Sequence, residues 1–213
     1  MNVEGRRPAG GAALLGWLAV IMLVVGTPTA PANAGEPAVL PTLHSNGPPP
    51  GHTGGFEEPT CRTCHSGFDL GLDGTLEFGG LPEAYQAGRI YVVTVTLHST
   101  EMEKAGFQAS VRFSSGDRRG HQAGVLRALD DRAFVVPSAE DPSIRYVQHA
   151  TAGTDVVDRE LAKWTFEWTA PVSTSDPVVF HASANSANGD ASPLGDLVYA
   201  TSRELRPTAF NGS

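Results

Sequence analysis

The sequence predicts an all-β protein, an immunoglobulin-like antiparallel β-sandwich preceded by an irregular arm. Segments with apolar side chains at every second position recur from residue 90 onward, as expected of strands with one buried face. Clusters of Gly, Asp, Pro and Ser lie between these segments and have the composition of turns. Helical periodicity is almost absent, and about seven short strands with regular turn signals are typical of a sandwich.

The first two expected strands, residues 89–99 and 106–113, alternate apolar with polar side chains and therefore have one apolar face. Residues 158–164 fit either a helical turn or a loop, and residues 188–196 have the Asn, Asp and Gly content of a turn. The remaining expected strands are residues 123–129, 134–137, 144–150, 163–171, 177–187 and 196–202.

Two clusters of side chains within these strands each admit two interpretations. Trp164, Phe166 and Trp168 alternate along one strand, and we expect them to fill the core, although three aligned rings also suit stacking on a sugar. The second cluster is rich in side-chain oxygens and fits either a calcium ion or a hairpin turn. Its members are Asn185, Asn188, Asp190 and Asp196.

The N-terminus has the pattern of a secretory signal peptide. Two arginines precede an apolar run over residues 12–25, and Ala32 and Ala34 follow at the spacing that a signal peptidase accepts. The run is shorter than the roughly 20 residues that cross a bilayer as a helix. We therefore expect residues 1–34 to be removed on export to the periplasm or beyond, leaving no stable membrane span. A retained membrane anchor is the alternative.

The mature chain is expected to form one domain with an appendage. Residues 35–80 form the Pro/Gly-rich arm, residues 81–204 the sandwich and residues 205–213 a C-terminal tail. Removal of residues 1–34 leaves 13 basic and 22 acidic residues, a net charge of −9. Such an acidic chain is not expected to bind nucleic acid.

The arm contains the only cysteines of the chain, in "PTCRTCHSG", where Cys61 and Cys64 are followed directly by His65. Four chemistries use cysteines at this spacing. A zinc site would have to recruit two distant histidines, because no second cysteine pair is present. A thioredoxin-like redox pair belongs to a βαβ unit, which this strand-rich chain does not offer. A Cys61–Cys64 disulfide suits an oxidising compartment but leaves His65 without a role.

Covalent haem c attachment is the fourth chemistry, and it accounts for all three residues of the C-x-x-C-H motif. Cys61 and Cys64 would each form a thioether with a haem vinyl group, and His65 would ligate the iron from the proximal side. We therefore predict one covalently attached haem c.

The chain also resembles bacterial Reeler-like extracellular proteins of the choice-of-anchor V type. The resemblance covers about residues 47–202 and rests on motifs in the expected order. It implies a Reeler-like sandwich after a CxxCH arm, together with haem binding. The motifs are "PPPGHTGGFEEPTCRTCH", "YVVTVTL", "AGFQASVRF", "YVQHATAG", "WTFEWTAP", "VVFHASANSANGD" and "GDLVYA".

A six-coordinate haem needs a second axial ligand, and three residues are candidates. His149 comes first, because it ends a predicted strand and the resemblance also implies a histidine there. His52 is second, because it is close in sequence to Cys61, and Met102 is third, although a lone methionine before a strand usually packs in the core. Hydrogen-bonded strand or loop positions are expected for His98, His121 and His181.

These observations predict an exported mono-haem c-type cytochrome-like protein that transfers one electron to an unidentified extracytoplasmic partner. Haem-based sensing or small-ligand binding is the variant if the sixth iron position is open. The alternative is a haem-free extracellular adhesion or carbohydrate-binding module with a Cys61–Cys64 disulfide. No hydrolase or nucleotide-binding motif is present, so we do not expect an enzyme of those classes.

Overall fold

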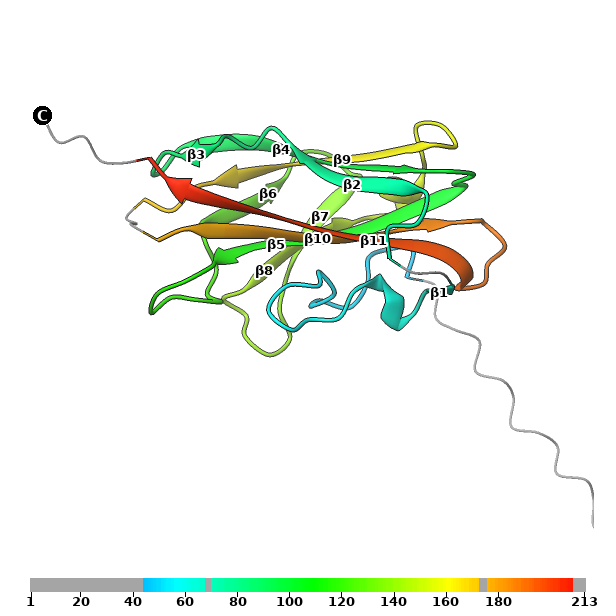
Figure 1. Ribbon diagram of the computed structural model, residues 1–213, viewed down its shortest axis with the longest axis horizontal. Coiled ribbons are helices and arrows are strands. Elements are labelled where there is room, and N and C mark those ends of the chain that lie inside the picture. Colours follow the sequence, from blue (N-terminus) through cyan, green and yellow to red (C-terminus); the bar gives the residue numbers. More distant parts are fainter. Residues whose placement is uncertain (1–43, 68–69, 173–175, 209–213) are drawn as a thin grey trace, which may run out of the picture. The chain divides into compact units, whose positions relative to one another are not determined.

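The computed structural model describes residues 44–67, 70–172 and 176–208 of the chain. Within these ranges the strands form two sheets that face each other across one hydrophobic core, so the predicted antiparallel β-sandwich is confirmed (Figure 1). The predicted signal peptide, residues 1–34, lies outside the described residues. Among the described residues, no helix is long and apolar enough to span a membrane.

The larger sheet has seven strands within the described residues. Its strands pair antiparallel, except that β1 and β3 run parallel to β11. In spatial order they are β1 (Ser66–Gly67), β11 (Leu194–Pro207), β10 (Val178–Ala187), β5 (Lys104–Phe113), β8 (Arg145–His149) and β7 (Ala133–Pro137), with β3 (Ala84–Tyr85) also on β11.

The smaller sheet has four antiparallel strands in the described part of the chain, and it lies over the other face of the core (Figure 1). Its order is β2 (Gly74–Gly79), β4 (Ile90–Ser99), β9 (Leu161–Thr169) and β6 (Val125–Ala128). Two single 3-10 turns are also present, η1 (Cys61–Thr63) and η2 (Thr151–Thr154).

The core between the sheets is aromatic. Trp164, Phe166 and Trp168 on β9 point inward and are at most 1% exposed, which confirms that they fill the core. The Trp164 ring stacks on Phe107 of β5 at 4.6 Å, and Trp168 meets Phe180 of β10 edge-on at 4.9 Å. Such ring pairs add stability beyond the area that they bury. These three rings therefore cannot stack on a sugar.

Two segments differ from the sequence prediction. Residues 74–79, expected to be part of the irregular arm, form strand β2, which pairs with β4 along its whole length. At the C-terminal end, β11 continues to Pro207, three residues beyond the expected end of the sandwich. Residues 158–160 form a turn, and β9 begins at Leu161, so the alternative of a helical turn there is wrong.

The arm, defined from here on as residues 44–67, lies on the outer face of the larger sheet, away from the smaller one (Figure 1). For this reason β5 and β10 are buried on both faces along almost their whole length. Three outward residues of β5 are polar and buried, namely Gln108, Ser110 and Arg112, and Gln108 and Arg112 hydrogen-bond to the arm. The sheet therefore has an apolar face toward the core and a polar face beneath the arm.

Candidate functional site

The CxxCH motif is held as a tight turn against the larger sheet. The Thr60 side chain caps η1 by accepting the Arg62 N–H at 3.3 Å. Within the turn, the carbonyl of Cys61 accepts the N–H groups of Cys64 at 3.2 Å and His65 at 2.9 Å. The Cys61 N–H donates in turn to Ser183 Oγ on β10, at 3.1 Å. This contact fixes the start of the motif to the middle of the sheet.

The end of the motif is fixed at the sheet edge, where it meets a buried carboxylate. Ser66 and Gly67 pair in parallel with Leu194 and Asp196 of β11, and this pairing brings His65 beside Asp196. The His65 Nδ1 atom lies 2.6 Å from Asp196 Oδ2. The Asp196 side chain is only 1% exposed, whereas that of His65 is 28% exposed. The pair therefore has one end in the protein and one end toward solvent.

This contact determines which nitrogen of His65 carries a proton. A carboxylate only accepts hydrogen bonds, so Nδ1 of His65 must be the donor to Asp196. Nε2 is then the nitrogen with a lone pair available for a metal. Metal-binding histidines usually donate their second ring N–H to a carboxylate or a carbonyl in this way, which orients the ring and raises its basicity. The sequence places Asp196 in a possible calcium cluster or turn and does not reveal its pairing with His65.

Both cysteines and four histidines line a single cavity of about 420 Å³. Its volume lies within the roughly 300–1,000 Å³ of sites that take small molecules or cofactors. The lining also includes apolar residues, among them Pro48, Pro49 and Pro193. Gly106 on β5 also lines the cavity, and a Cβ there would lie 2.7 Å from the His149 ring. The cysteine and histidine residues that line the cavity are Cys61, Cys64, His44, His52, His65 and His149.

The two cysteines differ in burial. Cys61 is 8% exposed and Cys64 is exposed, and both thiols are free. Burial raises the pKa of the Cys61 thiol to about 11, although the hydrogen bond with Ser183 opposes this shift. Cys61 is therefore a protonated thiol at neutral pH. The disulfide of the alternative interpretation is not formed in this structure.

His149, the first candidate for the distal ligand, is the last residue of β8 and is 6% exposed. Its Nδ1 lies 3.0 Å from the Phe107 nitrogen and 3.2 Å from the Phe107 carbonyl oxygen, and its Nε2 lies 2.9 Å from the carbonyl oxygen of His44. Burial lowers the pKa of His149, so the ring is neutral at pH 7. It lines the cavity as a hydrogen-bonded wall residue.

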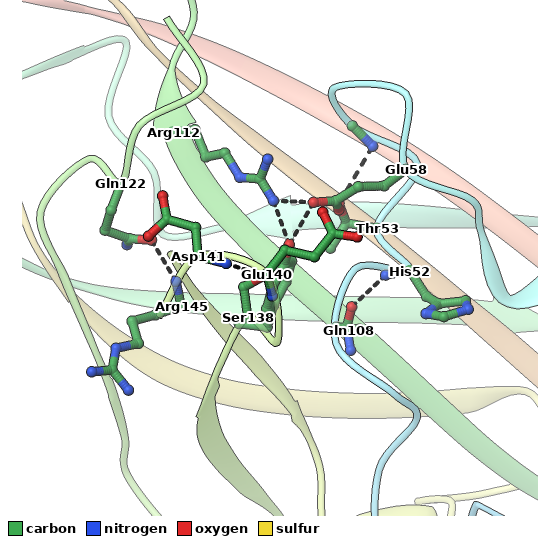
Figure 2. A network of polar contacts seen from close by, with 12 residues as sticks. His52, Thr53, Glu58, Gln108, Arg112, Gln122, Ser138, Glu140, Asp141 and Arg145 are labelled. Atoms are coloured by element: carbon green, nitrogen blue, oxygen red, sulfur yellow. Dashed lines mark hydrogen bonds and ion pairs between the residues drawn. The ribbon is translucent and has the colours of Figure 1, made fainter. Parts of the chain in front are cut away.

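His52, the second candidate, lies on the arm at the edge of the same cavity. Its backbone N–H donates to Gln108 Oε1 at 2.6 Å, and its Nδ1 lies 2.9 Å from the Pro49 carbonyl oxygen. Figure 2 shows the ring pointing away from the Glu58 carboxylate. Met102, the third candidate, is fully buried in the hydrophobic core and is not among the cavity residues.

A buried ionic network fastens the arm beside the cavity (Figure 2). Glu58 of the arm accepts hydrogen bonds from Arg112 of β5, from the Tyr146 hydroxyl at 2.5 Å and from Thr53 at 2.6 Å. The side chains of Arg112 and Glu58 are 7% and 13% exposed. The Arg112 guanidinium also lies over the Phe56 ring, 5.2 Å from its centroid. Sequence reasoning missed this network, because its members are far apart in the chain.

A preformed metal site is not seen among the described residues. No group of three or more His, Cys, Asp or Glu side chains in residues 44–67, 70–172 and 176–208 converges to hold a metal ion. The Asn188 and Asp190 side chains bond to each other and to the backbone of their own turn. Of the two interpretations of that segment, the hairpin turn is the one that the structure shows.

Comparisons with known proteins give similarity of fold only. No protein-family model and no curated protein matches the chain. Among solved structures, the Reelin-N domain of F-spondin is 18% identical, with 70% of this chain and 96% of that chain covered and a TM-score of 0.44. The human F-spondin reeler domain is 18% identical, with coverages of 68% and 95% and a TM-score of 0.43. A cohesin module from a Clostridium perfringens family 33 glycoside hydrolase is 14% identical, with coverages of 63% and 96% and a TM-score of 0.43. At this level of similarity, the neighbours bear on neither the family nor the function of this chain.

Proposed function

We propose that this chain is an exported mono-haem c-type protein that transfers single electrons to an extracytoplasmic partner. Cys61 and Cys64 would form the thioethers, and His65 would ligate the iron. When bound, the haem would supply reversible one-electron chemistry. The Reeler-like, choice-of-anchor V assignment belongs to the same proposal and rests on the sequence resemblance.

The observation that carries the proposal is the His65–Asp196 contact at the mouth of a cavity lined by both cysteines. The motif alone indicates haem c from sequence, but a disulfide would need no oriented imidazole. A buried carboxylate that holds Nδ1 and leaves Nε2 for a metal is the arrangement expected of a proximal ligand. This arrangement gives His65 a role that the disulfide interpretation lacks.

The chemistry of the residues present also supports the proposal. The cavity has a partly apolar wall, and Gly106 leaves space where any other residue would project a side chain. Cys64 is exposed, so one edge of the site reaches solvent, where a redox partner can approach. Both cysteines of the motif line the same cavity as His65, as covalent attachment requires.

The test is covalent haem in protein made with a cytochrome c maturation system. We expect wild-type protein to keep peroxidase-active haem on a denaturing gel and to give the pyridine haemochrome spectrum of haem c. The matched control is the double variant Cys61→Ala, Cys64→Ala, which should fold but lose the haem stain. A wild-type band without haem would overturn the proposal in favour of the haem-free module.

A further inference from the structure

We propose that His52 is the distal iron ligand of this site, in addition to His65; the inference rests on the proposed haem attachment. It reverses the order in which the sequence ranks His149 and His52. Both histidines line the cavity, so position alone does not separate them. The hydrogen bonds at their ring nitrogens distinguish the two residues.

An imidazole that ligates iron through Nε2 needs a lone pair on that atom and therefore carries its proton on Nδ1. The partner of Nδ1 determines whether this tautomer is present. His65 meets the requirement, because Nδ1 donates to the Asp196 carboxylate. A second axial ligand on this chain should show the same pattern, an oxygen acceptor at Nδ1 and no engagement of Nε2 by the protein.

Among the described residues, His52 shows this pattern. Its Nδ1 lies 2.9 Å from the carbonyl oxygen of Pro49, which can only accept, so Nδ1 carries the proton. Its backbone is fixed, since the His52 N–H donates to the fully buried Gln108 side chain, and Gln108 also donates to the Pro49 carbonyl at 3.0 Å. One buried amide thus holds both the ligand and the acceptor that orients it. His52 is therefore prepared in the same way as His65.

His149 differs from His52 at Nε2. That atom lies 2.9 Å from the His44 carbonyl oxygen, which can only accept, so Nε2 carries the proton, while Nδ1 lies 3.0 Å from the Phe107 nitrogen and 3.2 Å from the Phe107 oxygen. Ligation through Nε2 would move the ring proton to Nδ1 and leave the His44 carbonyl without this partner in a part-buried setting, and a lost partner is costly. The ring instead joins the start of the arm to β5 and β8, which is a positioning role.

The assignment deepens the proposed function. With His65 and His52 as axial ligands, both iron positions are filled by the protein, and no position is open to a small ligand. The site then favours electron transfer over haem-based sensing. Both ligands belong to the arm, so the ligand set does not depend on the loops of the sandwich.

Two measurements test the inference. In haem-free protein, long-range ¹H–¹⁵N NMR should show the Nδ1–H tautomer for His52 and His65 and the Nε2–H tautomer for His149. In haem-loaded protein, His52→Ala should convert the ferric spectrum from low spin to high spin while the haem stain is kept. Added imidazole should restore the low-spin spectrum. The matched control, His149→Gln, should stay low spin, since a glutamine amide can still donate to the His44 carbonyl.

The outcomes separate this inference from the proposed function. A low-spin His52→Ala protein with a high-spin His149→Gln protein would overturn the His52 assignment and leave the haem proposal intact. A high-spin wild-type protein would do the same, because it would show that no distal protein ligand is bound. Wild-type protein without covalent haem would instead overturn the proposed function itself.

Discussion

The two cysteines lie in one turn, but we expect them to differ in reactivity because only one of them is buried. Cys61 is covered by β10 and hydrogen-bonded to Ser183, whereas Cys64 reaches solvent at the cavity mouth. Only a thiolate reacts readily, and burial raises the pKa of Cys61 to about 11. If haem is attached as proposed, we expect the thioether at Cys61 to form on the unfolded chain, before the arm docks on the sheet.

We predict that Cys64 is alkylated much faster than Cys61 in folded, haem-free protein. At pH 8 a thiol of pKa about 11 has roughly a hundredfold less thiolate than an ordinary cysteine, and burial adds a steric barrier. Iodoacetamide labelling followed by trypsin and mass spectrometry reads the two sites separately, since cleavage after Arg62 divides them. Labelling in urea is the control and should remove the difference. Equal rates in the folded protein would contradict the prediction.

The residues of the motif were predictable from sequence, but their partners were not. Cys61, Cys64 and His65 are contiguous, so spacing alone brings them together. Asp196 is 131 positions from His65, and only the parallel pairing of β1 with β11 makes them neighbours. The order of His149 and His52 likewise depends on hydrogen bonds, which a pattern of residue types does not encode.

Among the elements, the strands with strict alternation were predictable, and the arm's contact face was not. The expected strands at residues 89–99 and 106–113 correspond to β4 and β5, because their inward residues are apolar. β2 was missed because glycines begin and end it, although Leu76 and Phe78 show the alternation of a strand. The polar face of β5 has the composition of a solvated surface, and it is buried only because the arm covers it.

The Glu58–Arg112 pair is the contact that we expect to hold the arm in place. Glu58→Ala leaves Arg112 as a buried cation, and removal of one member of a buried pair typically costs about 3 to 5 kcal/mol. We therefore expect a loss of about 3 kcal/mol in the free energy of unfolding, measured by urea denaturation. The arm amides bonded to Gln108 and Ser183 should also exchange hydrogen faster.

The matched control for this variant is Glu57→Gln, at the exposed neighbouring position. A substitution at such a surface site should change the free energy of unfolding by less than about 0.5 kcal/mol. Amides in the β4–β9 pair should keep their protection in Glu58→Ala, because these strands lie on the other side of the core. Equal stability of Glu58→Ala and wild type would show that the pair does not fasten the arm.

At the scale of the whole molecule, the packing of the arm on the larger sheet makes the free energy of unfolding depend on pH. The arm covers two histidines, His149 and His181. Burial lowers the pKa of both. His181 lies beneath the arm, with its ring edge-on to Phe56 and in the field of Glu58 and Arg112. Its buried Nδ1 has no hydrogen-bond partner in the described structure.

We predict that the free energy of unfolding falls as the pH drops below about 6.5, the ordinary pKa of histidine. In this window the unfolded chain binds protons that the folded chain does not, because the folded pKa values of His149 and His181 are lowered. Stability therefore rises with pH through this range and levels off above it. Urea unfolding at pH 5.5 and pH 7.5 measures the difference, above the range in which the carboxylates titrate.

His181→Phe tests the origin of this pH dependence. Phenylalanine keeps an aromatic ring against Phe56 and removes both the titrating group and the unpaired Nδ1. An unsatisfied buried polar atom costs about 1 to 3 kcal/mol, so the variant should be more stable than wild type at pH 7.5 by about 1 kcal/mol. It should also lose less stability between pH 7.5 and pH 5.5, since one of the two lowered pKa values is gone. An unchanged pH slope in His181→Phe, together with a flat slope in His149→Gln, would assign the acid sensitivity to His149 alone and contradict a contribution from His181.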